Sequence, residues 1–204
     1  MISACILTKN DAGFIDRVIH SVSPFVSEII VVDDKSTDNT KAIALSLGAI
    51  VYDLPLVLEE VGFGVAANWM LDKVTQEWIL IIDSDELLAE GPSLINLTRN
   101  KEKEIWALPR RKWASFKKGQ RCEYEAYPDW QIRFLRNTQD NRFEGQMHVR
   151  LNKKSFRAYR GPHIEHLQDE CRTQEKSIER ENLYKKLATK QGVAVIGGLL
   201  LEKL

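Results

Sequence analysis

The chain has 204 residues, of which 44% are hydrophobic, and its 29 basic and 29 acidic residues give a formal net charge of zero. This length and composition predict a single globular domain with a substantial core. A net charge of zero provides no global field that would attract nucleic acid, so we expect no nucleic-acid partner. The three cysteines are scattered and lack Cys-x-x-Cys spacing. This pattern favours a reducing compartment over a disulfide framework or a zinc site.

The first residues of the chain predict a strand rather than a targeting segment. A short apolar run, 2–7, is followed at once by polar residues, unlike the basic leader and long apolar core of a signal peptide. No segment reaches the roughly 20 apolar residues that a membrane-spanning helix needs. We therefore expect a cytoplasmic location, with peripheral attachment to the inner face of the plasma membrane left open.

Strands and helices alternate through the first half of the chain. In chain order we expect a strand at 2–7, a helix near 14–22, a strand at 28–32, a helix near 39–47, a strand at 49–52, a helix near 65–74 and a strand at 78–82. This alternation indicates an α/β fold in which helices cover both faces of a mostly parallel sheet.

After Gly91-Pro92 the alternation stops and the sequence becomes α+β in character. A short helix is expected near 93–100, strands near 105–108 and 131–135, and a charged helix near 169–190. We interpret 1–204 as one domain with an α/β half at 1–90, an α+β half at 91–168 and a helical C-terminal region at 169–204.

The most informative segment is the apolar strand 78–82, which runs directly into Asp83-Ser84-Asp85-Glu86. Such a strand is typical of a sheet buried on both faces, and ligands of open α/β sheets bind beyond the carboxyl ends of the strands. Carboxylates this close repel one another unless a cation lies between them. Mn²⁺ or Mg²⁺ carrying a phosphorylated ligand fits both conditions. For Asp-x-Asp alone, a solvated acidic turn is the simpler explanation.

Three further clusters fall at predicted strand ends or at the start of a helix. Thr8 and Asn10 follow the first strand, and Asp33-Asp34 closes the second, where a carboxylate can accept hydrogen bonds from a base or a ribose. The third cluster, 62–68, places two glycines before a helix whose free N–H groups could face a phosphate. Turn and capping chemistry explains each cluster alone, but their common location favours a nucleotide site.

Together these segments resemble family 2 glycosyltransferases of the GT-A fold, and are most similar to the bacterial branch with lipopolysaccharide-core and related surface-glycan transferases. The resemblance spans residue 2 to about 185. It rests on Thr8 and Asn10 and on segments 31–38, 62–68, 81–86, 127–136, 145–148 and 164–167. It implies a Rossmann-like nucleotide-diphospho-sugar transferase fold and an inverting, hexosyltransferase-type enzyme that uses Mn²⁺ or Mg²⁺. The implied substrates are a nucleotide-sugar, with a UDP-sugar as the first expectation, and a hydroxyl of a glycan or lipid-linked acceptor.

The resemblance also implies roles for individual residues. It assigns the metal to Asp85, to Asp83 directly or through water, and to His166, with His163 and His148 as competitors for the histidine. It assigns the diphosphate to Arg133, because guanidinium pairs well with phosphate. The donor-binding set is Thr8, Asn10, Asp33, Asp34, Gly64, Asn68, Asp83, Ser84 and Arg133.

An inverting displacement requires a general base beside the acceptor hydroxyl. We predict Asp129, because the aromatic turn 127–130 can place its carboxylate beside a sugar-stacking ring, with Glu86 and Glu144 as alternatives. An ordinary turn residue that caps backbone N–H groups is the competing explanation for Asp129.

One departure from the family pattern and one basic stretch leave alternatives open. Ala67 stands where related sequences usually carry Lys or Arg, so a phosphate-facing charge is either missing or supplied by another segment. The alternative function is therefore a catalytically weak nucleotide-sugar-binding or scaffold subunit of a glycan-assembly complex. The basic stretch 110–121 either borders the acceptor site, touches anionic lipid, or is an exposed hairpin.

Overall fold

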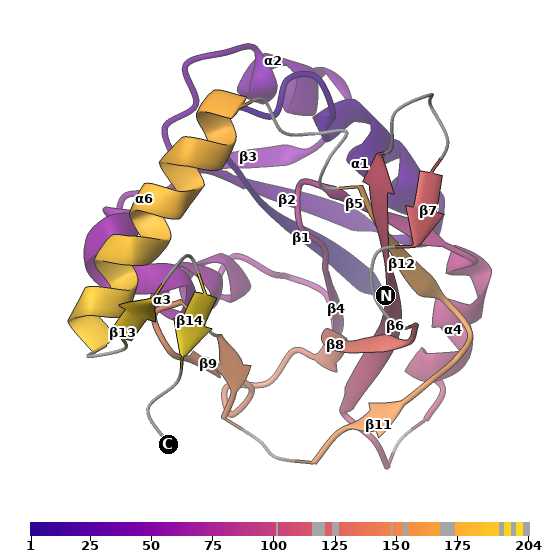
Figure 1. The fold of residues 1–204 in the computed structure, drawn as a ribbon. Coiled ribbons are helices and arrows are strands. Elements are labelled where there is room, and N and C mark those ends of the chain that lie inside the picture. Colours follow the sequence, from indigo (N-terminus) through magenta and orange to yellow (C-terminus); the bar gives the residue numbers. More distant parts are fainter. Residues whose placement is uncertain are drawn as a thin grey trace.

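A curled mixed sheet with helices on both faces forms the body of the protein (Figure 1). This computed structural model describes residues 1–100, 102–115, 121–123, 127–147, 149–152, 155–167, 174–191, 194–196 and 199–201. The strands are β1 (Ile2–Thr8), β2 (Glu28–Asp33), β3 (Ile50–Asp53), β4 (Trp78–Ile81), β5 (Glu86–Ala89), β6 (Ile105–Ser115), β7 (Arg121–Glu123), β8 (Asp129–Arg136), β9 (Phe143–Glu144), β10 (Arg150–Leu151), β11 (Arg157–Ala158), β12 (His163–His166), β13 (Ala194–Ile196) and β14 (Leu199–Leu201). The α-helices are α1 (Ile15–Val22), α2 (Thr40–Ser46), α3 (Leu58–Leu71), α4 (Leu94–Thr98) and α6 (Gln174–Gln191), and short 3₁₀ turns lie at Ser23–Phe25 and Gly91–Ser93.

The main sheet has the strand order β3-β2-β1-β4-β8-β6-β12-β5, and β7 and β11 pair with β6. The first four strands are mutually parallel, whereas β8 runs antiparallel to both β4 and β6. The carboxyl ends of β1, β2 and β4 therefore meet on one side of the sheet. This arrangement confirms the predicted α/β fold class.

Alternate residues of the parallel strands pack into two cores, one on each face of the sheet, because side chains alternate along a strand. Leu80 of β4 packs with α1, α2 and α4, while its neighbour Ile79 packs with α3. Both residues are essentially inaccessible to solvent. The apolar run that precedes the acidic cluster is thus buried on both faces, as the sequence predicts.

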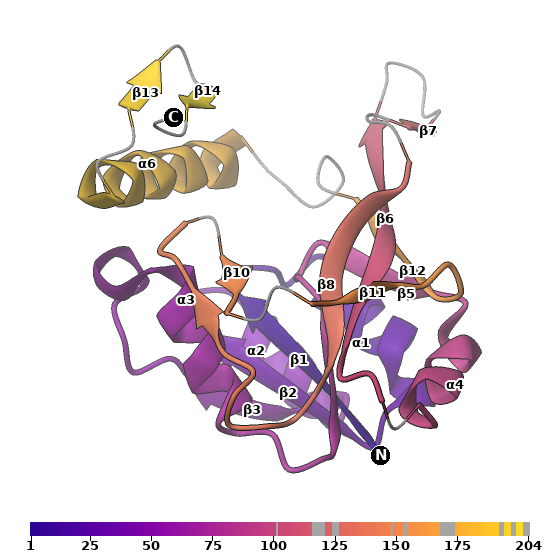
Figure 2. The same cartoon turned by 90° about the horizontal axis from the view of Figure 1, so that it is seen from below.

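Helix α3 begins earlier than predicted and contains the glycine cluster that we expected to lie before it. It runs from residue 58 to 71, and Gly62 adopts φ 80° and ψ 170° inside it, so the helix is kinked there. A positive φ is readily adopted only by glycine. Strands β6 and β8 are also longer than predicted, and β6 extends away from the sheet with β7 (Figure 2).

The glycines of α3 allow a distant segment of the backbone to approach closely. The N–H of Phe63 donates to the carbonyl of Gln146 (2.7 Å), and the N–H of Gly64 donates to the carbonyl of Gly145 (3.1 Å). Asn68 exchanges two hydrogen bonds with the backbone of Phe143, at 2.8 and 2.9 Å. The expectation of a free, phosphate-facing N–H is therefore wrong at Gly64, because that group already holds the segment around β9.

None of the helices in the described ranges is long and apolar enough to cross a bilayer.

The close approach at Gly64 predicts a steric effect on stability. An ideal Cβ at Gly64 would lie 2.4 Å from the Gly145 carbonyl oxygen, whereas one at Gly13 would have no neighbour within 4 Å. Gly64→Ala should lower the free energy of unfolding by about 1–3 kcal/mol, as overpacking does, although alanine normally favours a helix. Gly13→Ala is the matched control. Equal urea-unfolding midpoints for the two variants would contradict this account of the α3–β9 contact.

Candidate functional site

The loops that follow β1 and β2 are joined by hydrogen bonds. Thr8 lies opposite Asp33 in the β1–β2 register, and the N–H of Asp34 donates to the carbonyl of Thr8 (2.9 Å). The N–H of Asn10 donates to Ser36 Oγ (2.8 Å), and its own Oδ1 accepts the N–H of Thr37 (2.7 Å). Asn10 thus links the loop after β1 to the loop after β2.

The two neighbouring aspartates of the second cluster have different surroundings. Asp33 is fully buried, and its Oδ2 accepts the N–H of Ser36 (2.8 Å). Asp34 lines a large cavity at the strand ends, where Lys9 Nζ lies 3.6 Å from its Oδ2. Asp34 is therefore positioned for a ligand, whereas Asp33 shapes the turn.

Asp83 is held by an arginine from β8. Both terminal nitrogens of Arg133 donate to the Asp83 carboxylate, at 2.5 and 3.3 Å, and Arg133 Nη2 also donates to Glu86 Oε1 (2.7 Å). Burial alone would lower the pKa of Arg133, but the charges of Asp83 and Glu86 raise it above the ordinary value. Arg133 thus carries a permanent positive charge at the base of the cavity, which it also lines.

Glu86 is completely buried and accepts hydrogen bonds from two arginines. Arg110 Nη1 lies 3.2 Å from its Oε1, beside the Arg133 contact. Burial raises the pKa of Glu86, although the positive charges of Arg133 and Arg110 act to lower it. Because this carboxylate does not line the cavity, Glu86 is poorly placed to act as a base.

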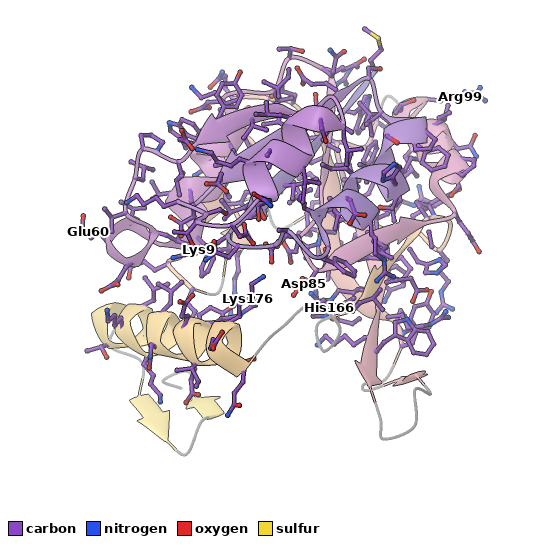
Figure 3. The ribbon with its side chains drawn as sticks, turned by 90° about the horizontal axis from the view of Figure 1, so that it is seen from above. Lys9, Glu60, Asp85, Arg99, His166 and Lys176 are labelled. Carbon is purple, nitrogen blue, oxygen red and sulfur yellow. The ribbon has the colours of Figure 1, made fainter. Side chains whose placement is uncertain are left out.

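Asp85 lies next to a histidine from β12. His166 Nε2 is 3.4 Å from Asp85 Oδ2, and Figure 3 shows the two side chains together. His163 points to the opposite face of the same strand, where its Nε2 lies 2.8 Å from Glu165 Oε1. His148 lies outside the described residues. Of the two histidines that are described on β12, His166 is the one that adjoins the acidic cluster.

Asp129, the predicted base, is bound to cations. Its Oδ2 accepts hydrogen bonds from Arg110 Nε (2.9 Å) and Nη2 (2.7 Å), and its Oδ1 accepts one from Gln131 (2.8 Å). Burial alone would raise the pKa of Asp129, but Arg110 and Gln131 outweigh it, so the pKa lies below its ordinary value. Lys112 Nζ lies 3.5 Å from the same Oδ2 of Asp129.

One cavity of about 1430 Å³ brings most of these strand ends together. Among the predicted residues it is lined by Thr8, Asp34, Asp83, Ser84, Asp85, Arg133 and Glu144. Its lining does not include Asn10, Asp33, Gly64, Asn68, Glu86, Asp129 or His166. Asp34 and Asp85, about fifty positions apart in the sequence, therefore share one cavity.

Sequence reasoning missed several residues that line the same cavity. Among them, Lys176 and Arg180 reach it from α6. Lys9, Asp11 and Trp130, which lie within the predicted motifs, line it as well. The spacing of Lys176 and Arg180, four positions apart in a charged helix, is a signal that both lie on one helical face. Nothing in the sequence shows which face of that helix meets the sheet.

Sequence comparison finds relatives among bacterial proteins. An uncharacterized glycosyltransferase from Rickettsia felis is 45% identical over 89 residues, which cover 44% of this chain and 30% of that protein. A TPR repeat-containing protein from Synechococcus elongatus is 34% identical over 87 residues, covering 43% of this chain and 21% of that protein. The matched region thus spans less than a third of these relatives.

Among solved structures, the chain is similar to glucosyl-3-phosphoglycerate synthase from Mycobacterium tuberculosis, crystallised with Mn²⁺, UDP and glucosyl-3-phosphoglycerate. The identity is 30%, the match covers 54% of this chain and 44% of that one, and the TM-score is 0.45. A structure of the same protein with Mg²⁺ and UDP gives 29% identity, coverages of 55% and 43%, and a TM-score of 0.44.

The sequence profile described as glycosyl transferase family 2 matches residues 3–160, more than three quarters of the chain. This region contains every strand of the main sheet except β12, and all the acidic residues of the strand ends. The match confirms the family that the motifs indicate, together with its GT-A fold. The chain belongs to glycosyl transferase family 2.

Proposed function

We propose that this chain transfers a sugar from a nucleoside-diphosphate donor to a hydroxyl of a saccharide acceptor, free or lipid-linked. The observation that carries the proposal is the shared cavity of Asp34 and Asp85 at the carboxyl ends of parallel strands, where α/β proteins bind nucleotides. Residues 1–90 would hold the donor, and 91–168 would border the acceptor. A UDP-sugar is the first donor to test.

The donor atoms at Asp85 and His166 fit a divalent metal ion. A carboxylate oxygen and an imidazole nitrogen 3.4 Å apart suit Mn²⁺, and Mg²⁺ is also commonly held by few protein carboxylates plus phosphate oxygens. Within the described residues no group of three or more such side chains converges, so oxygens of the diphosphate would complete the coordination. When bound, the ion would neutralise charge on the departing diphosphate. Asp83 is the weaker ligand candidate because Arg133 holds its carboxylate.

The protein's own groups would orient the nucleotide. The Asp34 carboxylate can accept hydrogen bonds from a base or a ribose hydroxyl, and Thr8 lies beside it across the β1–β2 pair. Arg133 presents a guanidinium to the cavity while remaining tied to Asp83 and Glu86.

Asp85→Asn tests the metal-dependent part of this proposal. UDP with Mn²⁺ at about 100 times its dissociation constant should stabilise the wild-type protein by about 2.7 kcal/mol. We expect the Mn²⁺-dependent part of the melting-temperature increase to disappear in Asp85→Asn and to persist in Asp140→Asn, whose side chain is exposed in a turn. A full Mn²⁺-dependent shift in Asp85→Asn would refute the assignment of Asp85.

For the general base we propose Glu144 in place of Asp129. Of the three carboxylates predicted for this role, only Glu144 lines the cavity. Its side chain is exposed, whereas Glu86 is buried between two arginines and Asp129 is held by Arg110. An exposed carboxylate on the cavity wall can approach an acceptor hydroxyl, and an inverting displacement requires such a group.

Glu144→Gln should lower kcat by about 100-fold or more, because a general base typically contributes that much. The KM for the donor should change little, since the charge is removed on the acceptor side. Asp129→Asn is the comparison, and we expect its main effect on the free energy of unfolding through the loss of the Arg110 pair. Release of the leaving nucleotide provides the assay: UDP, GDP or dTDP from the corresponding diphosphate sugars, and CMP from CMP-sugars. Loss of turnover in Asp129→Asn with normal activity in Glu144→Gln would reverse the assignment.

The acceptor side offers an aromatic surface but little uncompensated charge. Trp130 lines the cavity, and indole rings stack well on sugars. In the basic stretch, Arg110 and Lys112 contact Asp129, and Arg111 lies 3.5 Å from Glu165. Lys117 and Lys118 lie outside the described residues. Because the three described cations already face acids, we propose that this stretch shapes the acceptor site rather than binding anionic lipid.

A further inference from the structure

Helix α6 forms one wall of the cavity, opposite the strand ends. Lys176 Nζ lies 2.7 Å from Asp11 Oδ1 in the loop after β1, and Figure 3 shows Lys176 directed toward the body of the protein. One turn later, Arg180 Nη1 lies 4.0 Å from Asp85 Oδ2. Two basic side chains of one helical face thus reach the loops that carry the acidic clusters.

The packing of α6 is fixed by apolar residues at its other end. Leu187 and Ala188 are fully buried and pack with Met147, and the rings of Phe63 and Tyr184 meet edge to face at 6.0 Å. Figure 2 shows α6 on the same side of the molecule as α3 and β10. The helix therefore has an apolar anchor on α3, and its basic turn extends from that anchor over the cavity.

The contacts between α3 and α6 define an antiparallel register. Lys186 Nζ lies 2.8 Å from Glu59 Oε1, and Tyr184 contacts Phe63, so numbers rise along α3 as they fall along α6. Ala67 lies one turn beyond Phe63 on α3 and Arg180 one turn beyond Tyr184 on α6, each on the same helical face as that contact, because residues four apart lie on one face of a helix. Both Ala67 and Arg180 line the cavity.

Ala67 is the position at which the resemblance leads us to expect a phosphate-facing Lys or Arg. We propose that Arg180, assisted by Lys176, supplies this charge from α6 and binds the diphosphate of the donor. The inference rests on the proposed function. A guanidinium presents a planar fork of donors that matches phosphate oxygens. Arg180 already lies beside Asp85, the group through which we expect the diphosphate to be anchored, and 44% of its side chain is exposed for contact.

Binding of UDP and of uridine, each with Mn²⁺, tests the inference, because only UDP carries the phosphates. Loss of one charged hydrogen-bonding group typically costs about 10- to 100-fold in affinity, so we expect Arg180→Gln to weaken UDP binding by that factor. Uridine binding, followed by NMR titration, should not change. Lys185→Gln is the matched control, because Lys185 pairs with Glu181 on the same helix and does not line the cavity.

A second-site variant makes the test specific to the α3–α6 pairing. Ala67→Arg combined with Arg180→Gln should recover most of the lost UDP affinity, because it returns a guanidinium to the lining of the same cavity. Circular dichroism and the melting temperature show whether each variant is folded. A destabilised Arg180→Gln would be replaced by Arg180→Lys, which keeps the charge and should lose less UDP affinity than the neutral variant.

The outcomes separate this inference from the proposed function. A wild-type protein that binds UDP with Mn²⁺, and an Arg180→Gln variant that binds it equally well, would overturn the role of Arg180 alone. Equal losses of UDP and uridine binding would also overturn it, because they would indicate a structural effect. A wild-type protein that binds neither UDP nor uridine would overturn the proposed function and the inference together.

Discussion

The buried carboxylate of Glu86 fixes how the strands of the site are arranged. A carboxylate without solvent exposure is costly unless cations satisfy it, and removal of one partner of such a pair typically destabilises strongly. Here β6 supplies Arg110 and β8 supplies Arg133, both within hydrogen-bonding distance of Glu86. Arg133 then holds Asp83, and Arg110 holds Asp129. Through these contacts one ion-pair chain joins the loop after β4 to the antiparallel half of the sheet.

This chain of ion pairs gives different surroundings to the two aspartates of the Asp-Ser-Asp segment. Asp83 turns to Arg133, whereas Asp85 faces His166 on β12. By residue type and spacing alone the two carboxylates look equivalent, because neither reveals which of them meets an arginine fifty residues away. The register of β8 beside β4, and of β12 beside β5, decides this. The residue type at each position is thus readable from the sequence, but its partner depends on strand pairing in the second half of the chain.

The predictable part of the site is the part that depends on apolar periodicity. Buried strands with βα connections imply a parallel sheet, and a parallel sheet brings Asp34 and Asp85 to the same edge. The prediction for the glycine cluster, 62–68, is wrong because it rests on local sequence alone. The N–H groups of Phe63 and Gly64 donate to carbonyls of Gln146 and Gly145, about eighty residues away. No local sequence pattern identifies a backbone partner at that distance. Helix α6 was predicted as a helix, but its orientation depends on a few apolar residues, including Leu187 and Ala188, within a polar sequence.

The family match ends at residue 160, yet the cavity is closed by residues that follow it. The ends of β1, β2 and β4 contribute more carboxylates than cations, and α6 contributes Lys176 and Arg180 on the opposite wall. A ligand that combines a divalent cation with a diphosphate would complement both walls, because the cation faces acids and the phosphates face bases. The ion pair between Lys176 and Asp11 already joins the two walls. The shared family region therefore explains how a nucleotide could be held at the sheet, and on our proposal the segment beyond it adds positive charge for the diphosphate.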